Sequence, residues 1–226
     1  MSIIKRRRLE LKVTPDEKLE EYFFKQIEMS KDRAMKKFAD NINESKERIL
    51  SSIRIEAIFE SYPVESRDAG KIILECTTFG SEMLVKVLET SDEVLLYVVI
   101  AFGYDAIEKE EDDMMKLLFL DSWGTVAIGA ADSMLEEILK EELAEQDLYT
   151  THSWSPGQHE VDISLQAPLF GLLKPEETGV KLNQSYMMYP KKSISGIIGI
   201  GRDKDVSQIR ACDYCKLRET CPSAYS

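Results

Sequence analysis

Three cysteines in the last fifteen residues have the spacing of a metal-binding site. They are Cys212, Cys215 and Cys221, which form a C-x2-C-x5-C pattern. A two-residue gap lets two thiolates face one ion, as in zinc and iron–sulfur sites. The pattern predicts a zinc or iron–sulfur site at these three residues, with a fourth ligand supplied from elsewhere.

The fourth ligand has several candidates. Cys76 or one of the two histidines, His152 and His159, would complete the site, as would an exogenous ligand or the corrinoid of a partner. Arg210 lies before the cysteines and Lys216 lies among them, and nearby positive charge lowers a thiol pKa. A lowered pKa favours metal binding or redox reactivity. The alternative is that these cysteines are reduced structural thiols, or disulfide-prone thiols, that bind no metal.

A second candidate site surrounds Ser155-Pro156-Gly157. A Pro-Gly pair predicts a tight turn, and the backbone groups of such a turn can hold a ligand. A turn that binds nothing explains the same pattern equally well. Ser155 is not expected to be a hydrolase nucleophile, because no nucleophile-elbow pattern surrounds it.

The composition excludes some classes of partner. The chain has 226 residues and a net charge of -12, and 43% of its residues are hydrophobic. Nucleic-acid binding needs a basic face, so no such partner is expected. The basic cluster at residues 5–8 is expected to be a solvated arm. Because the chain has neither a run of about 18 apolar residues nor the apolar core of a signal peptide, we expect a cytoplasmic protein without a membrane partner.

Helical spacing of apolar residues indicates four helical regions. The first begins at Thr14, where Thr14-Pro15-Asp16-Glu17 has the pattern of a capping box with a proline at the first helical position. The expected helical ranges are 14–41 with a further stretch to about 50, 80–90, 105–146, and 164–173.

The expected strands alternate with these helices irregularly. Residues 93–102 are nearly all apolar and often β-branched, so they should form a central strand covered on both faces. Other strands are expected at 53–60, 71–76, 186–189 and 194–200, the last two joined around Pro190. This mixture predicts an α+β fold with a twisted, largely antiparallel sheet flanked by helices.

We expect one domain with a tail. Residues 1–65 should contribute a helical segment and the first strand to the same domain as the core, which spans 66–202. Residues 203–226 form the cysteine-containing tail.

Four short segments of the final third occur in an order that no generic fold requires. They are Ser155-Pro156-Gly157, Gly179-Val180-Lys181-Leu182, residues 185–190 (Ser-Tyr-Met-Met-Tyr-Pro) and residues 193–196 (Ser-Ile-Ser-Gly). They resemble the Pro-Gly loop, the Gly-Met-Lys-Leu-type turn and the Ser-aromatic-x-Met-aromatic-Pro-x-x-Ser-Val-Ser-Gly stretch of the activation domain of cobalamin-dependent methionine synthase. The resemblance covers residues 90–200. Stand-alone bacterial relatives of that domain often end in a short cysteine cluster, as this chain does.

The resemblance implies a function in corrinoid reactivation. In the family the domain binds S-adenosylmethionine and caps the cobalamin domain, and a flavodoxin-type donor supplies the electron for reductive methylation. It implies a corrinoid-binding partner, or a methionine synthase that lacks its own activation domain, and no catalytic residue on this chain. The cofactor-binding residues it implies are Ser153, Ser155, Pro156, Gly157, Gln158, Met188, Ser193 and Ser195.

Two positions of the loop depart from the family pattern Arg-x-x-Pro-Gly-Tyr. Ser153 replaces the Arg, whose forked donors suit a carboxylate, and Gln158 replaces the aromatic Tyr. His152 has no such fork. Two hypotheses follow. In the first, the chain supports S-adenosylmethionine-dependent reductive methylation of a partner's corrinoid. In the second, it has lost the ability to bind S-adenosylmethionine, and it binds a metal, an iron–sulfur cluster or a corrinoid without catalysis.

Overall fold

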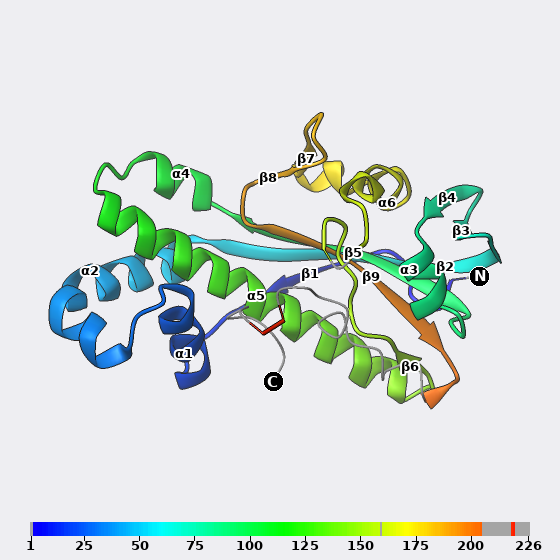
Figure 1. The fold of residues 1–226 in the computed structure, drawn as a ribbon, viewed down its shortest axis with the longest axis horizontal. Helices are drawn as coiled ribbons and strands as arrows, with labels where there is room; N and C mark the ends of the chain where they lie inside the picture. The colour runs from blue at the N-terminus through cyan, green and yellow to red at the C-terminus, as the bar shows by residue number, and fades with distance from the viewer. Residues whose placement is uncertain (1, 159, 205–217, 220–226) are drawn as a thin grey trace.

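A twisted antiparallel sheet forms the centre of the molecule (Figure 1). The computed structural model describes residues 2–158, 160–204 and 218–219. Three long strands run through the middle of the sheet: β2 (Arg54–Asp68), β5 (Glu93–Phe102) and β9 (Ser193–Gly201). The strand order is β4-β3-β2-β5-β9-β6, with β1 beside the first half of β2, and each pairing is antiparallel. The predicted α+β class is confirmed.

Short strands complete the sheet and a separate hairpin. The outer strands are β1 (Arg7–Leu11), β3 (Lys71–Leu74), β4 (Thr77–Gly80) and β6 (Tyr149–Thr150), and the hairpin consists of β7 (Lys181–Leu182) and β8 (Met188–Tyr189). The sequence predicted strands at 186–189 and 194–200 joined around Pro190. In the structure β8 pairs with β7, whereas β9 pairs with β5 and β6.

Helices cover both faces of the sheet. The helices are α1 (Glu17–Gln26), α2 (Lys31–Ser52), α3 (Glu82–Val87), α4 (Tyr104–Lys109), α5 (Met114–Ala144) and α6 (Gln166–Leu173), with 3-10 turns at Ile163–Leu165 and Pro175–Thr178. Tyr97 and Val99 of β5 pack with the buried residues of α1, α2 and α5. Leu96 and Val98 pack with those of α3 and α6. The expectation of a central strand covered on both faces is confirmed.

The N-terminal helical region is divided into two helices. Asp16, not Thr14, is the N-cap of α1, and its side chain accepts a hydrogen bond from the Leu19 amide at 2.7 Å. Glu28 has a φ of +53°, and the amide of Met29 donates to the Phe24 carbonyl at 3.2 Å. These bonds end α1 and reverse the chain before α2 begins. A continuous helix from 14 to 41 is therefore wrong.

The predicted helix at 105–146 is also divided. α4 ends at Lys109, and Asp113 caps α5 by accepting from the Met115 and Lys116 amides at 2.7 and 3.2 Å. An aspartate before a helix is a strong N-cap, so the second half of the acidic run starts a new helix instead of continuing the first.

The basic residues near the N-terminus belong to the fold. Arg7 and Arg8 lie in β1, which pairs with β2, and the Arg7 guanidinium lies 5.0 Å from the centre of the Phe59 ring. Arg6 forms an ion pair with Glu177 at 3.1 Å and donates to the Lys174 carbonyl. The expectation of a solvated arm is wrong, because the backbone of Arg7 and Arg8 pairs with β2 and the side chains of Arg6 and Arg7 form ion pairs.

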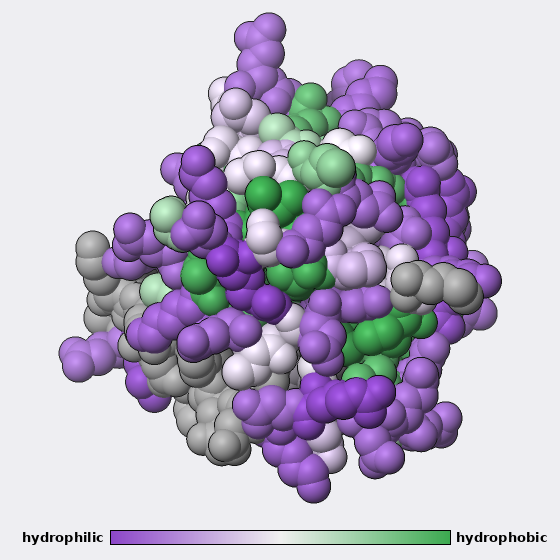
Figure 2. Space-filling model, turned by 90° about the vertical axis from the view of Figure 1, so that its right-hand side faces the viewer, coloured by the Kyte–Doolittle hydropathy of each residue, from purple (hydrophilic) through white to green (hydrophobic). Residues whose placement is uncertain are grey.

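The surface at the β3–β4 end is mainly hydrophilic, with small separate hydrophobic areas (Figure 2). The apolar side chains of this end point inward: Ile72, Leu74 and Phe79 are nearly inaccessible. Within the described part of the chain, no helix combines the length and apolarity that a membrane span needs.

Candidate functional site

A tyrosine of β5 and a serine of the segment after β6 meet on the α5 face of the sheet. Tyr97 of β5 is opposite Gly196 of β9, and the segment after β6 runs along β9 so that the Ser153 Oγ lies 2.8 Å from the Tyr97 Oη. A Cβ atom at position 196 would lie 2.3 Å from the Tyr97 ring and 2.4 Å from the Ser153 Oγ. The contact therefore requires glycine at this position.

Two carboxyl groups of α5 lie beside this contact. Asp132 and Glu136 are four residues apart, so they share one face of the helix. Both are half-buried, and the Asp132 Oδ1 is a buried atom without a hydrogen-bond partner among the described residues. We call Tyr97, Asp132, Glu136 and Ser153 the carboxyl cluster.

Burial dominates the electrostatics of the carboxyl cluster. Burial raises the pKa of Asp132 to about 6, and the Tyr97 hydroxyl partly offsets that rise. Burial also raises the pKa of Glu136 to about 7, with a further contribution from the Asp132 charge. The pKa of the fully buried Tyr97 hydroxyl is raised well above its usual value, first by burial and then by both acids. Near neutral pH the tyrosine is neutral and the two acids change their protonation.

The Ser155-Pro156-Gly157 segment forms a closed turn. The Gly157 amide donates to the Val161 carbonyl at 2.8 Å, and the Gln158 amide donates to the Ser155 carbonyl at 3.1 Å. Gly157 has a φ of +92°, and a Cβ there would lie 2.8 Å from the Ile163 Cδ1. Glycine is required, and the Gly157 amide is already used within the loop.

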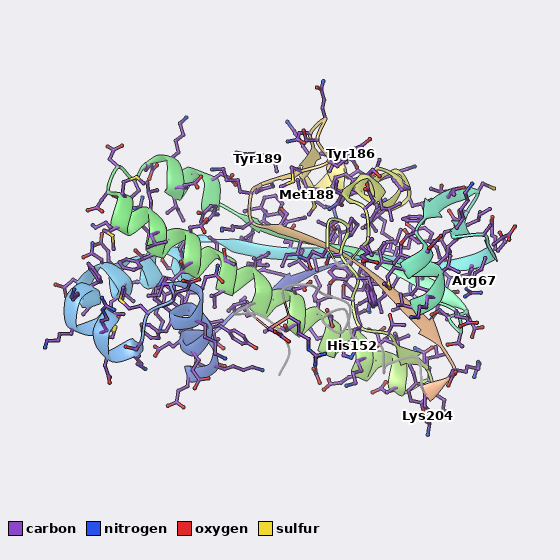
Figure 3. All side chains as sticks on the ribbon, in the orientation of Figure 1. Arg67, His152, Tyr186, Met188, Tyr189 and Lys204 are labelled. Atoms are coloured by element: carbon purple, nitrogen blue, oxygen red, sulfur yellow. The ribbon has the colours of Figure 1, made fainter. Side chains whose placement is uncertain are left out.

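The remaining expected cofactor-binding residues lie away from the carboxyl cluster. Ser195 is buried on the α6 side, where its Oγ accepts from the Gln166 Nε2 at 2.8 Å. The Ser193 Oγ donates to the Pro190 carbonyl at 2.8 Å. Met188 lies on the β7–β8 hairpin, whereas His152 lies well apart from it, towards the C-terminal half of α5 (Figure 3). The expected residues are thus not gathered in one site.

The proposed metal ligands cannot be placed. Cys212, Cys215 and Cys221 lie outside the described residues. Cys76 is an exposed thiol in the turn between β3 and β4. In the ranges that the structure describes, no group of three or more His, Cys, Asp or Glu side chains is arranged to hold a metal ion.

The fold has a counterpart among solved structures. A crystal structure of the MetH reactivation domain bound to AdoHcy matches 93% of this chain and 83% of that domain, with a TM-score of 0.61 and 18% sequence identity. The chain has the reactivation-domain fold. The resemblance seen in the four segments of the final third is therefore confirmed at the level of the fold. No protein-family model matches the chain, and no curated protein matches it.

The reactivation-domain fold brings together residues that the sequence analysis overlooked. Asp132 and Glu136 look like the start of a solvated helix face, because Glu137, Lys140 and Glu141 follow them in the sequence. Their spacing of four within a largely apolar helix was the available signal. Their position opposite Tyr97 depends on the sheet and could not be predicted from α5 alone.

Proposed function

We propose that this protein is a stand-alone reactivation module, which binds S-adenosylmethionine at the carboxyl cluster and supports reductive methylation of a corrinoid on a partner protein. The proposal is supported by the reactivation-domain fold, whose solved counterpart is bound to AdoHcy. The observation that carries it further is the buried Oδ1 of Asp132, which has no hydrogen-bond partner among the described residues and lies beside the segment that leads into the Pro-Gly turn. The partner would be a corrinoid-binding protein or a methionine synthase without its own activation domain, with a flavodoxin-type electron donor.

The carboxyl cluster fits the cationic part of S-adenosylmethionine. That part contains a sulfonium and an ammonium group, and a buried cation needs anionic acceptors nearby. Asp132 and Glu136 provide carboxylates, and the Asp132 Oδ1 has no other partner within the described residues. A bound cation would favour the ionised form of both acids and offset the effect of burial on their pKa values.

The chain's own residues contribute position and charge. When bound, S-adenosylmethionine would supply its sulfonium methyl group to a corrinoid that has received one electron from an external donor. Asp132 and Glu136 would hold the positive end of the ligand, and Tyr97 would keep the Asp132 carboxyl in place. The closed turn at Ser155–Gln158 offers a preformed wall, because its backbone bonds are satisfied internally.

Calorimetric titration with S-adenosylmethionine tests binding. We expect measurable heat, and we expect Asp132→Asn to weaken affinity about tenfold or more, since a charge-assisted contact contributes about 1.5–3 kcal/mol. Glu137→Gln is the matched control, because Glu137 is an exposed neighbour on the same helix. The absence of heat at millimolar ligand would contradict the proposal.

Methylation is tested separately. A cobalamin-loaded methionine synthase fragment that lacks its activation domain is mixed with this protein, S-adenosylmethionine and titanium(III) citrate as the reductant. The expected result is a methylcobalamin absorption spectrum that depends on this protein. Binding without methylation would retain the ligand site and reject the reactivation function with this partner.

The cysteine pattern supports a second candidate function. We propose that Cys212, Cys215 and Cys221 bind zinc or an iron–sulfur cluster, because C-x2-C spacing suits thiolate ligation. Anaerobically purified protein should contain metal by elemental analysis, and replacing Cys212 and Cys215 with serine should remove it, whereas Cys76→Ser tests whether Cys76 is the fourth ligand. Unchanged metal content in the double variant would reject these ligands.

A further inference from the structure

The carboxyl cluster contains two acids, Asp132 and Glu136, that form no ion pair within the described part of the chain. The ion pairs among the described residues include neither Asp132 nor Glu136. The side chain at position 153 reaches the cluster, but it is a serine whose hydroxyl contacts Tyr97. Half-buried carboxylates without a counter-charge are unfavourable, so the pair has two ways to be stabilised: a proton or a cationic ligand.

The geometry couples protonation of the pair to the binding of a cationic ligand. Asp132 and Glu136 lie one helical turn apart, close enough for the charge of one to raise the pKa of the other. In the free protein near pH 6 to 7 the pair therefore retains a proton for part of the time. A cation placed beside both carboxylates would displace that proton to solvent.

We propose that the carboxyl cluster is a charge-selective subsite, which exchanges a proton for the ligand's positive charge and thereby prefers S-adenosylmethionine over S-adenosylhomocysteine. The inference rests on the proposed S-adenosylmethionine site and specifies how that site chooses its ligand. The two molecules differ at sulfur, where one has a methylated sulfonium cation and the other a neutral thioether. Both ligands carry the ammonium group, so the sulfonium is the additional charge that the ionised pair can stabilise in S-adenosylmethionine. Such a subsite would release the demethylated product in favour of fresh methyl donor.

Other titratable groups around the pair must be separated from it. Tyr97 faces it from β5 but stays neutral, because its pKa is raised well above the usual value. Glu137 follows Glu136 on α5, and its charge raises the pKa of Glu136. His152 precedes Ser153 on the segment that runs along β9, so its imidazole must be tested separately from the pair.

The test is calorimetric titration with S-adenosylmethionine and with S-adenosylhomocysteine between about pH 5.5 and about pH 8, in buffers of different ionisation enthalpy. Affinity for S-adenosylmethionine should rise about tenfold across this range, with a proton released to the buffer, because the ionised pair is the binding form. Affinity for S-adenosylhomocysteine should change less than about threefold.

Variants assign the effect to the pair. Glu136→Gln should remove most of the pH dependence of the affinity and most of the proton release. Because the ligands' own amino groups titrate equally with both proteins, subtracting the variant's values from the wild-type values removes that contribution. Glu137→Gln and His152→Gln are the controls and should retain the wild-type pH slope. Circular dichroism establishes that each variant is folded, and Asp132→Asn provides a second substitution if Glu136→Gln fails to fold.

The outcomes distinguish this inference from the proposed function. If both ligands bind with the same pH slope, or if Glu136→Gln retains the wild-type selectivity, charge selection is overturned while the binding site stands. If His152→Gln alone removes the slope, the histidine and not the carboxyl pair is responsible, which also overturns it. If neither ligand binds at millimolar concentration, both the inference and the proposed function fail.

Discussion

At the scale of single residues, Glu136 links stability to pH. Its pKa is about 7 in the folded protein and 4.5 in the unfolded chain. As pH rises through this interval, the Glu136 carboxyl of the unfolded chain loses its proton first. The free energy of unfolding therefore falls progressively, and the fall is complete above pH 7.

We therefore expect Glu136→Gln to stabilise the protein at about pH 8 by roughly 1–3 kcal/mol, and to have little effect near pH 4.5. Urea unfolding at the two pH values measures the difference. Glu137→Gln should show no comparable dependence, because Glu137 is exposed. A stabilisation that is the same at both pH values would contradict the assigned pKa.

Some residues of the candidate site could be predicted from the sequence and others could not. Ser153 was identified from the loop pattern, and its hydroxyl contacts Tyr97 within the carboxyl cluster. Gln158 was identified in the same way and lies in an exposed turn. Asp132 and Glu136 were missed, because local sequence does not show that a helical acid faces a buried tyrosine from another strand.

At the scale of elements, Gly196 sets how closely β9 and the Ser153 segment approach β5. We expect Gly196→Ala to destabilise the fold by about 1–3 kcal/mol, because the new methyl group would overlap the Tyr97 ring and the Ser153 hydroxyl. It should also weaken ligand binding. Thermal unfolding and calorimetric titration measure the two effects.

Gly129→Ala provides the matched control. Gly129 lies inside α5, and a Cβ there would meet nothing within 4 Å. The substitution should leave stability unchanged or raise it by up to about 1 kcal/mol, because alanine favours a helix over glycine. Equal destabilisation by both substitutions would show that the close approach at β9 is not the cause.

Elements with strong internal patterns were predicted well. The bounds of β5 were predicted correctly, because a run of β-branched and apolar residues favours a strand covered on both faces. β1 was missed because its arginines suggest a solvent-exposed segment. Its strand conformation comes from pairing with β2, where Arg7 also lies over the Phe59 ring. The breaks inside the long helical regions were not predicted. One lies at Glu28, after the end of α1, and the other at Asp113, which caps the start of α5.

At the scale of the whole molecule, the contacts of α5 with α1 and α2 are remote from the carboxyl cluster. Trp123 stacks on Phe23 of α1 at 4.1 Å between ring centres, and its Nε1 donates to the Ile42 carbonyl of α2 at 3.2 Å. Asp132 lies nine residues further along the helix, about 13.5 Å at the usual rise. The N-terminal half of α5 thus holds α1 and α2, and the C-terminal half carries the acids.

Trp123→Ala should lower the free energy of unfolding by about 3–5 kcal/mol. The fraction that stays folded should bind S-adenosylmethionine with wild-type affinity, because the carboxyl cluster is remote. Chemical denaturation and titration at low temperature test the two statements. Met114→Ala is the control for α5, since Met114 is 78% exposed. Loss of binding in folded Trp123→Ala protein would show that the two halves are coupled.

The position of β5 between β2 and β9 makes it a reporter for the rest of the molecule. Its backbone is paired along both edges and its side chains are buried on both faces, so its amide hydrogens should exchange with deuterium only when the whole domain opens. A molecule that binds only the folded protein slows this exchange by a factor set by its concentration and dissociation constant. The deuterium uptake of one strand would therefore reveal a bound molecule, even before its place on the protein is known.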